Sequence, residues 1–271
     1  MAARPVTPDR GGRAPQTAYV LHRYDWSESS LILDVFTRGQ GRIAVVAKGA
    51  KRPYSQLRAV LLPFQRLLVS AGHRKGDDQA EVQLLRSAEW AGGGPMPSGA
   101  GLLTGFYLNE LLMKALARQD PHPVLFDAYE QTLPWLAVTG DDMALEVALR
   151  AFELVLLRQT GVLPELDCVT QTQAPLQATA PYRLEPQLGV RAVATEGDAI
   201  SGASLQAIEQ ALAAGDLAGV RQACAGSRAA LKPQLRALLL YHLGTAAMRT
   251  RQVMLDAQKL LEPPFNEPVS P

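Results

Sequence analysis

The hydrophobic period of this chain changes once, at a short tract rich in glycine and proline. Residues 91–99 read AGGGPMPSG, which cannot form the interior of a helix or strand and marks a domain boundary. Before this tract, apolar and polar residues alternate, as they do in half-buried strands. After it, apolar residues recur every three or four positions, as in amphipathic helices. We therefore expect a β domain, a linker over 91–99 and a helical domain, which together make an α+β fold.

The β domain is predicted to span residues 17–90 and to contain five short strands. They are expected at about 17–24, 29–37, 41–48, 64–70 and 80–86. In the second and third strands, one face carries the apolar residues Leu31, Leu33, Val35, Ile43, Val45 and Ala47. The connection from the third strand to the fourth is long and basic. Five strands in roughly seventy residues with these connections favour a five-stranded Greek-key barrel of the OB type.

The helical domain is predicted to span residues 100–261, with a small irregular lobe at 164–200. Helices are expected at about 101–118, 143–159, 204–214 and 216–225, and again after Pro233. Glu146 and Arg150 lie one turn apart and are predicted to pair on the outer face of their helix. Within the lobe, residues 182–184 and 190–192 suggest a hairpin. At the two ends of the chain, we expect a flexible basic arm at 1–16 and a disordered, proline-rich tail at 262–271.

The net charge of +1 conceals an uneven distribution along the chain. Residues 1–90 carry 14 Lys and Arg against 8 Asp and Glu, residues 91–220 carry 6 against 15, and residues 221–259 carry 7 against 1. For any single cation, a solvated surface position is the simpler interpretation. The segregation as a whole indicates that the two basic regions meet polyanions, while the acidic middle meets solvent or basic proteins.

The sequence carries none of the common catalytic or cofactor motifs. Its glycines form neither G-x-G-x-x-G nor a phosphate loop, and its four histidines lack metal-ligand spacing. The paired carboxylates at 77–78 and 141–142 lie in polar loops, where turns or a helix cap are the simpler role. Cys168 and Cys224 are far apart, which favours a reducing cytoplasm, and no run approaches the roughly 20 apolar residues of a membrane span. We expect no cofactor and no membrane partner.

Several tracts, taken in order, resemble one known family. They are Tyr19–His22, Trp26–Leu31, Asp34–Thr37, Val46–Ala50, Leu85–Glu89, Gly105–Leu112 and Arg150–Leu154. Together they are similar to the bacterial RecO family of recombination and repair mediators, over roughly residues 17–256. The resemblance implies a non-enzymatic protein of the RecF pathway, located in the cytoplasm at the nucleoid. It would bind single- and double-stranded DNA, anneal strands and help replace the single-stranded-DNA-binding protein by recombinase.

The resemblance also implies protein partners and raises the question of a metal. The partners would be RecR, the acidic C-terminal tail of the single-stranded-DNA-binding protein, and possibly RecF and the recombinase RecA. Many RecO-like proteins hold zinc with four cysteines in the lobe, but here only Cys168 stands in that segment. We therefore predict no zinc, and a lobe held together by apolar packing around Leu163, Leu166, Leu176 and Tyr182.

The candidate DNA-binding residues lie in the β domain. The cations are Arg42, Lys48, Lys51, Arg52, Arg58, Arg66, Arg74 and Lys75, which would neutralise phosphates in a salt-dependent manner. Arg42 and Lys48 have the opposite parity to the apolar face of their strand. Tyr24, Trp26 and Tyr54 flank this set and could stack on unpaired bases. Tyr54 is the better candidate, since Trp26 could instead plug the barrel.

A second basic region near the end of the helical domain is the candidate site for the acidic peptide. It combines Lys232, Arg236, Leu239, Arg249 and Arg251, since an acidic tail with an apolar end needs an apolar pocket rimmed by cations. Leu239 could equally be ordinary core. Glu110 is expected to accept a hydrogen bond from a backbone amide or an arginine. Two rival functions remain open, a protein scaffold that never binds DNA and a metal-dependent nuclease using Asp77, Asp78 or Asp141.

Overall fold

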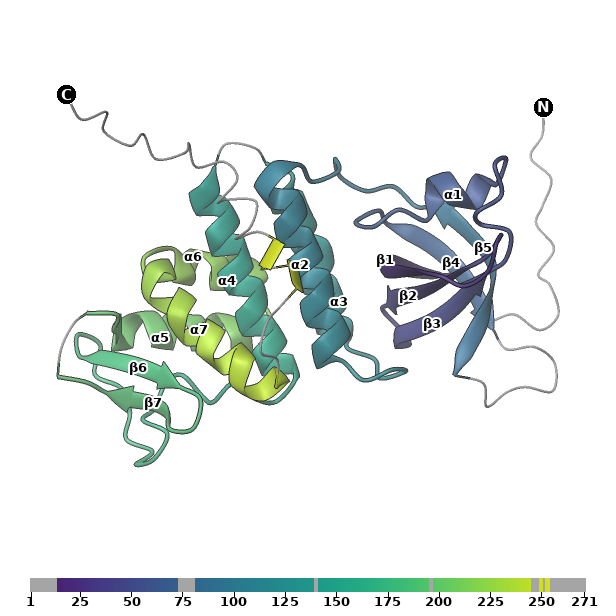
Figure 1. Cartoon of the computed structure of the whole chain (residues 1–271). Helices are drawn as coiled ribbons and strands as arrows, with labels where there is room; N and C mark the ends of the chain where they lie inside the picture. Colours follow the sequence, from purple (N-terminus) through teal and green to yellow (C-terminus); the bar gives the residue numbers. More distant parts are fainter. Residues whose placement is uncertain are drawn as a thin grey trace, which may run out of the picture.

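A closed five-stranded barrel is followed by a helical domain in the computed structural model (Figure 1), which describes residues 14–72, 81–138, 141–194, 197–244, 249–250 and 252–253. The strands are β1 (Gln16–Asp25), β2 (Leu31–Thr37), β3 (Gly41–Ala47), β4 (Leu67–Gly72) and β5 (Val82–Trp90). They close in the order β1-β2-β3-β5-β4, with β3 and β5 parallel and the other pairs antiparallel. The predicted OB-type barrel and α+β fold are confirmed.

The barrel encloses the apolar face that the alternation predicted. Leu33, Val35, Ile43 and Val45 are all buried in its interior core. One short helix was not predicted: α1 (Gln56–Val60) lies within the long basic connection from β3 to β4, and its Leu57 and Val60 pack against the barrel core. That connection is therefore partly ordered by apolar contacts.

The helical domain contains α2 (Gly99–Ala115), α3 (Pro123–Leu136), α4 (Asp142–Gln159), α5 (Gly202–Ala213), α6 (Leu217–Ala225) and α7 (Arg228–Leu243). Helix α3 was not predicted, although Pro123 is in its first turn, where the missing N–H costs nothing. Helix α7 begins before Pro233, which lies inside it, so the expectation of a helix starting after that proline was wrong. Asp141 caps α4 by accepting a hydrogen bond from the amide of Ala144.

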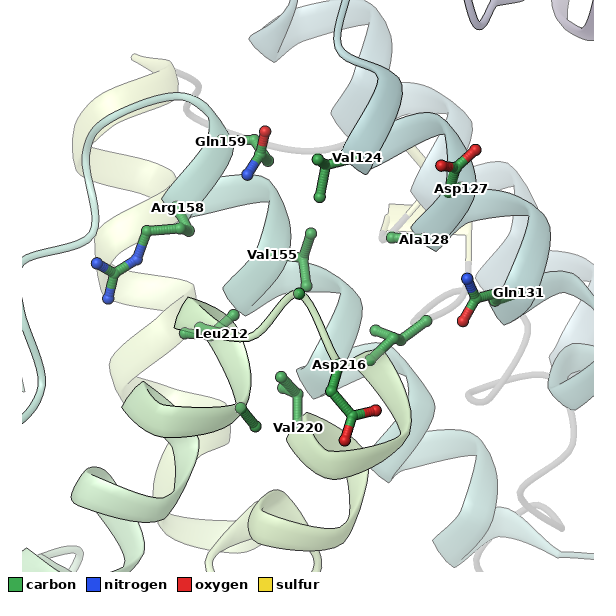
Figure 2. A pocket seen from close by; sticks show the side chains of 13 residues that line it. Val124, Asp127, Ala128, Gln131, Val155, Arg158, Gln159, Leu212, Asp216 and Val220 are labelled. Atoms are coloured by element: carbon green, nitrogen blue, oxygen red, sulfur yellow. The ribbon is translucent and has the colours of Figure 1, made fainter.

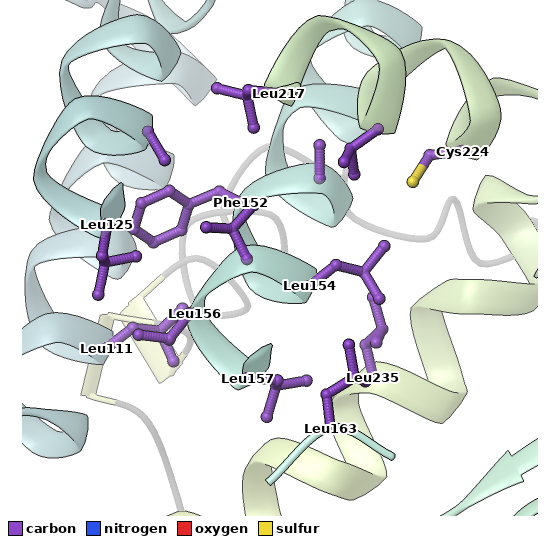
Figure 3. Packing of buried hydrophobic residues seen from close by; sticks show 14 of the residues in the cluster. Leu111, Leu125, Phe152, Leu154, Leu156, Leu157, Leu163, Leu217, Cys224 and Leu235 are labelled. Carbon is purple, nitrogen blue, oxygen red and sulfur yellow. The ribbon is translucent and has the colours of Figure 1, made fainter. Parts of the chain in front are cut away.

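Helix α4 is the centre of the helical core. Phe152, Leu154, Leu156 and Leu157 point to different sides of it and are all buried against neighbouring helices (Figure 3). Because other helices pack around α4, cations of these helices can reach charged side chains on it.

This setting explains why the predicted pairing of Glu146 with Arg150 is wrong. Arg150 is buried and pairs with the buried Glu153, with 2.7 Å between Nη1 and Oε2. Glu146 instead pairs with Lys232 of α7 at 3.1 Å and lies 3.7 Å from Arg228. The cations that approach from α7 replace the partner expected on the same helix.

The lobe between α4 and α5 contains a small sheet of β6 (Pro181–Glu185), β7 (Gly189–Ala192) and β8 (Ile200–Ser201), in the order β7-β6-β8. The predicted hairpin is confirmed by the pairing of Tyr182 with Ala192 and of Leu184 with Val190. The four residues predicted to hold the lobe together, Leu163, Leu166, Leu176 and Tyr182, are all buried.

The helical core extends onto the outer face of the barrel, whose interior forms a separate core. Alternation along β1 directs Ala18 and Val20 into the barrel, while Tyr19 and Leu21 belong to the helical core. The rings of Tyr19 and Phe36 pack at 5.5 and 5.3 Å from that of Phe126 of α3. The helical domain therefore covers part of the outer face of the barrel.

Polar contacts complete this junction. Asn109 of α2 donates to the carbonyl of Leu21 at 3.0 Å and accepts from the hydroxyl of Tyr129 at 2.6 Å. Gly41, in the left-handed region at φ 67°, lies so close to the carbonyl of Asp120 that a Cβ would overlap it. These contacts position the barrel against α2 and α3.

Candidate nucleic-acid interface

The outer face of strands β1 to β3 is covered at one end and open at the other. At the covered end, Tyr19 lies opposite Phe36 in the register, and both are buried under the helical domain. At the open end, Tyr24 lies opposite Ile32, and Tyr24 is 41% exposed. In OB folds the central strands and the first hairpin loop form the usual surface for oligonucleotides. Only the open end of this face is accessible to such a ligand.

Two loops border the open end, residues 26–30 between β1 and β2 and residues 48–55 after β3. Trp26 in the first loop is 65% exposed and Tyr54 in the second is 99% exposed. Trp26 therefore does not plug the barrel, whose interior is filled by aliphatic side chains of the strands. Both aromatic side chains are free to contact a flat ligand.

Three of the predicted cations are exposed on the connection from β3 to β4. Lys48 and Arg52 belong to the loop and Arg58 belongs to α1. Within the part of the chain that the structure describes, none of the three has a carboxylate within ion-pair distance. Their charges are available to an external anion.

Lys51 lies among these cations but has partners of its own. Its ammonium group donates to the carbonyl of Ser27 at 3.1 Å and pairs with the carboxylate of Asp25 at 3.1 Å. Its backbone amide donates to the carbonyl of Ser29 at 3.0 Å. Lys51 thus joins the two loops that border the open end.

Two other cations predicted to bind DNA lie at the domain junction instead. Arg42 donates to the carbonyl of Met113 of α2 and lies 3.8 Å from the buried carboxylate of Asp34. Arg66 pairs with Glu130 of α3 at 3.0 Å. Strand parity placed Arg42 on the outer face correctly, but the helical domain covers that part of the face. Arg42 and Arg66 are therefore not part of the candidate interface.

The remaining predicted cations, Arg74 and Lys75, lie outside the described residues.

Near the open end, Asp34 is surrounded by Arg42, by Arg118 at 3.9 Å and by Tyr24. Burial and the adjacent Asp34 carboxylate raise the pKa of Tyr24 above its usual value, so its hydroxyl stays neutral. The negative charge of Asp34 is compensated within the molecule.

The second candidate site is a cavity of about 660 Å³ between α2, α4 and α7. Its lining combines apolar groups, cations and carboxylates, contributed by Ala100, Tyr107, Asp142, Leu145, Glu146, Leu149, Arg150, Glu153, Lys232, Pro233 and Arg236. The predicted Lys232 and Arg236 thus come together here. Arg150 was not predicted as a site residue. The sequence feature that could have revealed it is a cation within an otherwise apolar stretch of a helix.

Of the other three residues predicted for this site, two are placed elsewhere by the structure. Leu239 is 4% exposed, packs in the helical core and does not line the cavity, which is the alternative that the sequence left open for it. Arg249 is not among the residues that line the cavity, and its backbone amide donates to Glu110 at 2.9 Å. Arg251 lies outside the described residues. Among the described residues of the predicted set, Lys232 and Arg236 line the cavity.

Two carboxylates of the helical domain have shifted pKa values. Burial raises the pKa of Glu153 above its usual value, although Arg150 and the hydroxyl of Tyr107 oppose this shift. Burial also acts to raise the pKa of Glu110, but hydrogen bonds from Thr250 and Arg249 and the neighbouring Lys114 outweigh it, so that pKa is lowered. The predicted hydrogen bond from a backbone amide to Glu110 is confirmed.

A smaller cavity of about 180 Å³ lies between α3, α4 and the α5–α6 corner (Figure 2). Val124, Val155 and Val220 line it, and its cation, Arg158, is already paired with Glu209. This lining offers an anionic peptide less than the larger cavity does.

Two further observations bear on metal and membrane. Ligand atoms of Glu165, Asp167 and Cys168 lie within 4.8 Å of one another, but the two carboxylates are exposed, and such groups often gather without a metal. Among the described helices, none has the length and apolar character needed to cross a bilayer.

Comparison with known sequences defines the class of protein. The family model for the N-terminal domain of Recombination protein O matches residues 13–91, and the model for its C-terminal domain matches residues 98–252. The two matches follow the barrel and the helical domain. They indicate a protein of DNA recombination and repair.

Individual relatives narrow this further. The DNA repair protein RecO of Polaromonas naphthalenivorans (strain CJ2) is 54% identical over 247 residues, covering 90% of this chain and 97% of the relative. That of Verminephrobacter eiseniae (strain EF01-2) is 54% identical over 250 residues, covering 91% and 97%. That of Acidovorax ebreus (strain TPSY) is 49% identical over 272 residues, covering 96% and 100%. The chain belongs to the RecO family, as the resemblance implied.

Proposed function

We propose that this protein is a non-enzymatic mediator of DNA repair and homologous recombination that binds DNA at the open end of its barrel. The observation that carries the proposal is the group of unpaired cations, Lys48, Arg52 and Arg58, beside exposed aromatic side chains on an OB-type barrel. Cations without internal partners neutralise phosphates and release counterions, which gives binding that is salt-dependent and nearly independent of sequence.

Strand annealing follows from the same charges. Two complementary strands repel one another through their phosphates, and a protein that neutralises both backbones removes part of that repulsion. The process needs no nucleotide hydrolysis and no catalytic residue. In this role the protein binds both single strands and the duplex that they form.

The cavity between α2, α4 and α7 is the proposed site for the acidic tail of the single-stranded-DNA-binding protein. Leu145, Leu149 and Pro233 give it apolar walls, and Lys232 and Arg236 are exposed at its edge. Glu146 also lines the cavity, but Lys232 and Arg228 compensate its charge. An acidic peptide with an apolar end matches this combination.

Two sites of this kind would let the protein reach DNA covered by the single-stranded-DNA-binding protein. The tail would recruit the mediator, and the barrel would take up strand as the bound protein is displaced. With RecR and RecF as partners, it would then help load the recombinase RecA at the nucleoid in the cytoplasm. Membership of the RecO family supports this part of the proposal.

Two rival functions are less well supported. A scaffold that never binds DNA leaves the unpaired cations of the open end without a role. A nuclease would need carboxylates free to hold a metal, but Asp141 caps α4 by accepting the Ala144 amide at 2.8 Å. Asp77 and Asp78 lie outside the described residues.

The test is a fluorescence-anisotropy titration with a labelled oligonucleotide at several salt concentrations, and with a separately labelled acidic tail peptide. Arg52→Ala should weaken DNA binding and reduce the salt slope by about 1, while Arg236→Ala should weaken peptide binding alone. Arg191→Ala, which removes an equal charge from the lobe, is the control for both. Binding of neither ligand by the unmodified chain would refute the proposal, and divalent-dependent loss of labelled DNA would favour the nuclease.

A further inference from the structure

The two loops at the open end are held in one arrangement by short-range hydrogen bonds. In the first loop, the carbonyl of Ser30 accepts from the amides of Trp26 at 3.3 Å and Ser27 at 3.4 Å. In the second loop, the amide of Arg52 donates to the carbonyl of Gly49 at 3.2 Å. Lys51 connects the two loops through the carbonyls of Ser27 and Ser29. The contacts of Lys51 therefore link the two loops, and each loop carries one exposed aromatic residue.

The aromatic residues on these loops are exposed and lack a ring partner among the described residues. No ring contact involves Trp26 or Tyr54 within the described chain, whereas Tyr19, Phe36, Phe64, Phe126 and Tyr129 all pack against other rings. Exposing a large aromatic surface is unfavourable in water, and such residues mark binding sites when they lie together. The unpaired cations Lys48, Arg52 and Arg58 lie on the same connection as Tyr54.

We propose that Trp26 and Tyr54 form a stacking site for unpaired bases, which gives the barrel a preference for single-stranded over double-stranded DNA. This inference rests on the proposed DNA-binding function and adds the ligand class of its site. Stacking needs a free base face, which single strands offer and a closed duplex hides inside its base stack. The cations alone would bind both forms through their phosphates.

Lys51 is then a positioning residue rather than a phosphate contact. Its ammonium group is already used by Asp25 and by the carbonyl of Ser27, the residue that follows Trp26. Its role is to keep the Trp26 loop against the Tyr54 loop, so that both rings can engage neighbouring bases of one strand. This assignment replaces the one that the basic sequence of the loop suggested.

The experiment titrates the full chain with a labelled single strand of about 16 nucleotides, the upper end of an OB-fold footprint, and with the same strand in a duplex. Trp26→Ala and Tyr54→Ala should each weaken single-strand binding about 5- to 150-fold, with duplex binding changed less than about twofold. The control is Trp90→Ala, because Trp90 is 63% exposed but lies at the end of β5.

Lys51 is tested by Lys51→Met and Lys51→Arg at several salt concentrations. Lys51→Met should reduce the preference for single strands without changing the salt slope, whereas a lost phosphate contact would lower the slope by about 1. Lys51→Arg keeps a donor for Asp25 and Ser27 and should keep the preference. In a Trp90→Phe, Trp135→Phe background, single strand should quench the remaining Trp26 fluorescence, and Lys51→Met should reduce that quenching at saturation.

The outcomes separate the two proposals. Equal losses for single strand and duplex in Trp26→Ala and Tyr54→Ala, or no loss in either, would overturn the stacking site while leaving DNA binding intact. A salt slope lowered by Lys51→Met would overturn its positioning role. If the unmodified chain bound neither form of DNA, the proposed function itself would fail.

Discussion

The two ends of the barrel's outer face use the same residue types for opposite purposes. At the covered end, Tyr19, Phe36 and Arg42 are directed at the helical domain, where they pack against rings or bond to a backbone carbonyl. At the open end, Tyr54 and Arg52 have no carboxylate or ring partner among the described residues. The element opposite a side chain, rather than its chemistry, decides between a structural and a binding role.

This difference predicts which measurement, stability or ligand binding, should respond to the loss of each charge. A charge with an internal partner contributes to the free energy of unfolding and little to ligand binding. A charge left to solvent contributes to ligand binding and little to stability, since exposed side chains change stability only slightly. Substitutions at the two ends should therefore give opposite pairs of results.

The largest expected effect is at the covered end, for Gly41→Ala. The added Cβ would meet the carbonyl of Asp120, and alanine is strained at φ 67°. We expect a loss of about 2–4 kcal/mol in the free energy of unfolding, measured by urea titration. Gly39→Ala is the matched control in the same turn, because its Cβ would meet only Gln16 Oε1 at 3.5 Å. Equal stability of the two variants would contradict the close approach of the domains.

The next effect is a crossed comparison of Arg42→Ala with Arg52→Ala. Removing Arg42 deprives the Met113 carbonyl of its donor and leaves Asp34 with one cation fewer, which should cost about 2 kcal/mol of stability. It should leave the salt slope of DNA binding unchanged.

Arg52→Ala should do the reverse, with stability within about 0.5 kcal/mol of the unmodified chain and a salt slope reduced by about 1. Urea titration and anisotropy on the same preparations measure both quantities. If Arg42→Ala lowered the salt slope as much as Arg52→Ala, the covered end would belong to the DNA interface, and the comparison would be wrong.

Local patterns predicted what depends on neighbours along the chain. Strand alternation gave the barrel interior, the Gly-Pro tract gave the change to helices, and the lobe hairpin followed from short apolar runs. Helix α3 was not predicted, and it contains Pro123 in its first turn and Pro134 inside its last turn. Propensity alone could not weigh them against its buried face, in which Phe126 and Tyr129 pack on the barrel.

The candidate site shows the limit of the same reasoning. Parity placed Arg42 on the outer face, but no pattern along one strand can reveal that another domain covers it. The basic loop was expected to bind phosphate throughout, yet Lys51 is engaged by Asp25 and Ser27, which precede it by more than twenty residues. Residue type predicted the kind of site, and contacts between residues far apart in the sequence determined which residues belong to it.

The smallest expected effect concerns Glu110, a charge that joins residues 249–250 to helix α2. Glu110 lies on α2, and its carboxylate accepts hydrogen bonds from the amides of Arg249 and Thr250, both at 2.9 Å, as an N-cap residue does. Glu110→Gln should therefore cost about 1 kcal/mol. Hydrogen exchange at the two amides should also become faster.

This contribution has a defined dependence on pH. Because the pKa of Glu110 in the folded protein is lower than its usual value of 4.5, the unfolded chain binds the extra proton first. The contribution is complete above pH 4.5 and is lost as the pH falls through the lower folded value. Unfolding curves should show this loss in the unmodified chain but not in Glu110→Gln, with Glu89→Gln, exposed near the end of β5, as the control. A loss that persists in Glu110→Gln would assign the acid sensitivity to another carboxylate. It would also contradict a stabilising contact between Glu110 and residues 249–250.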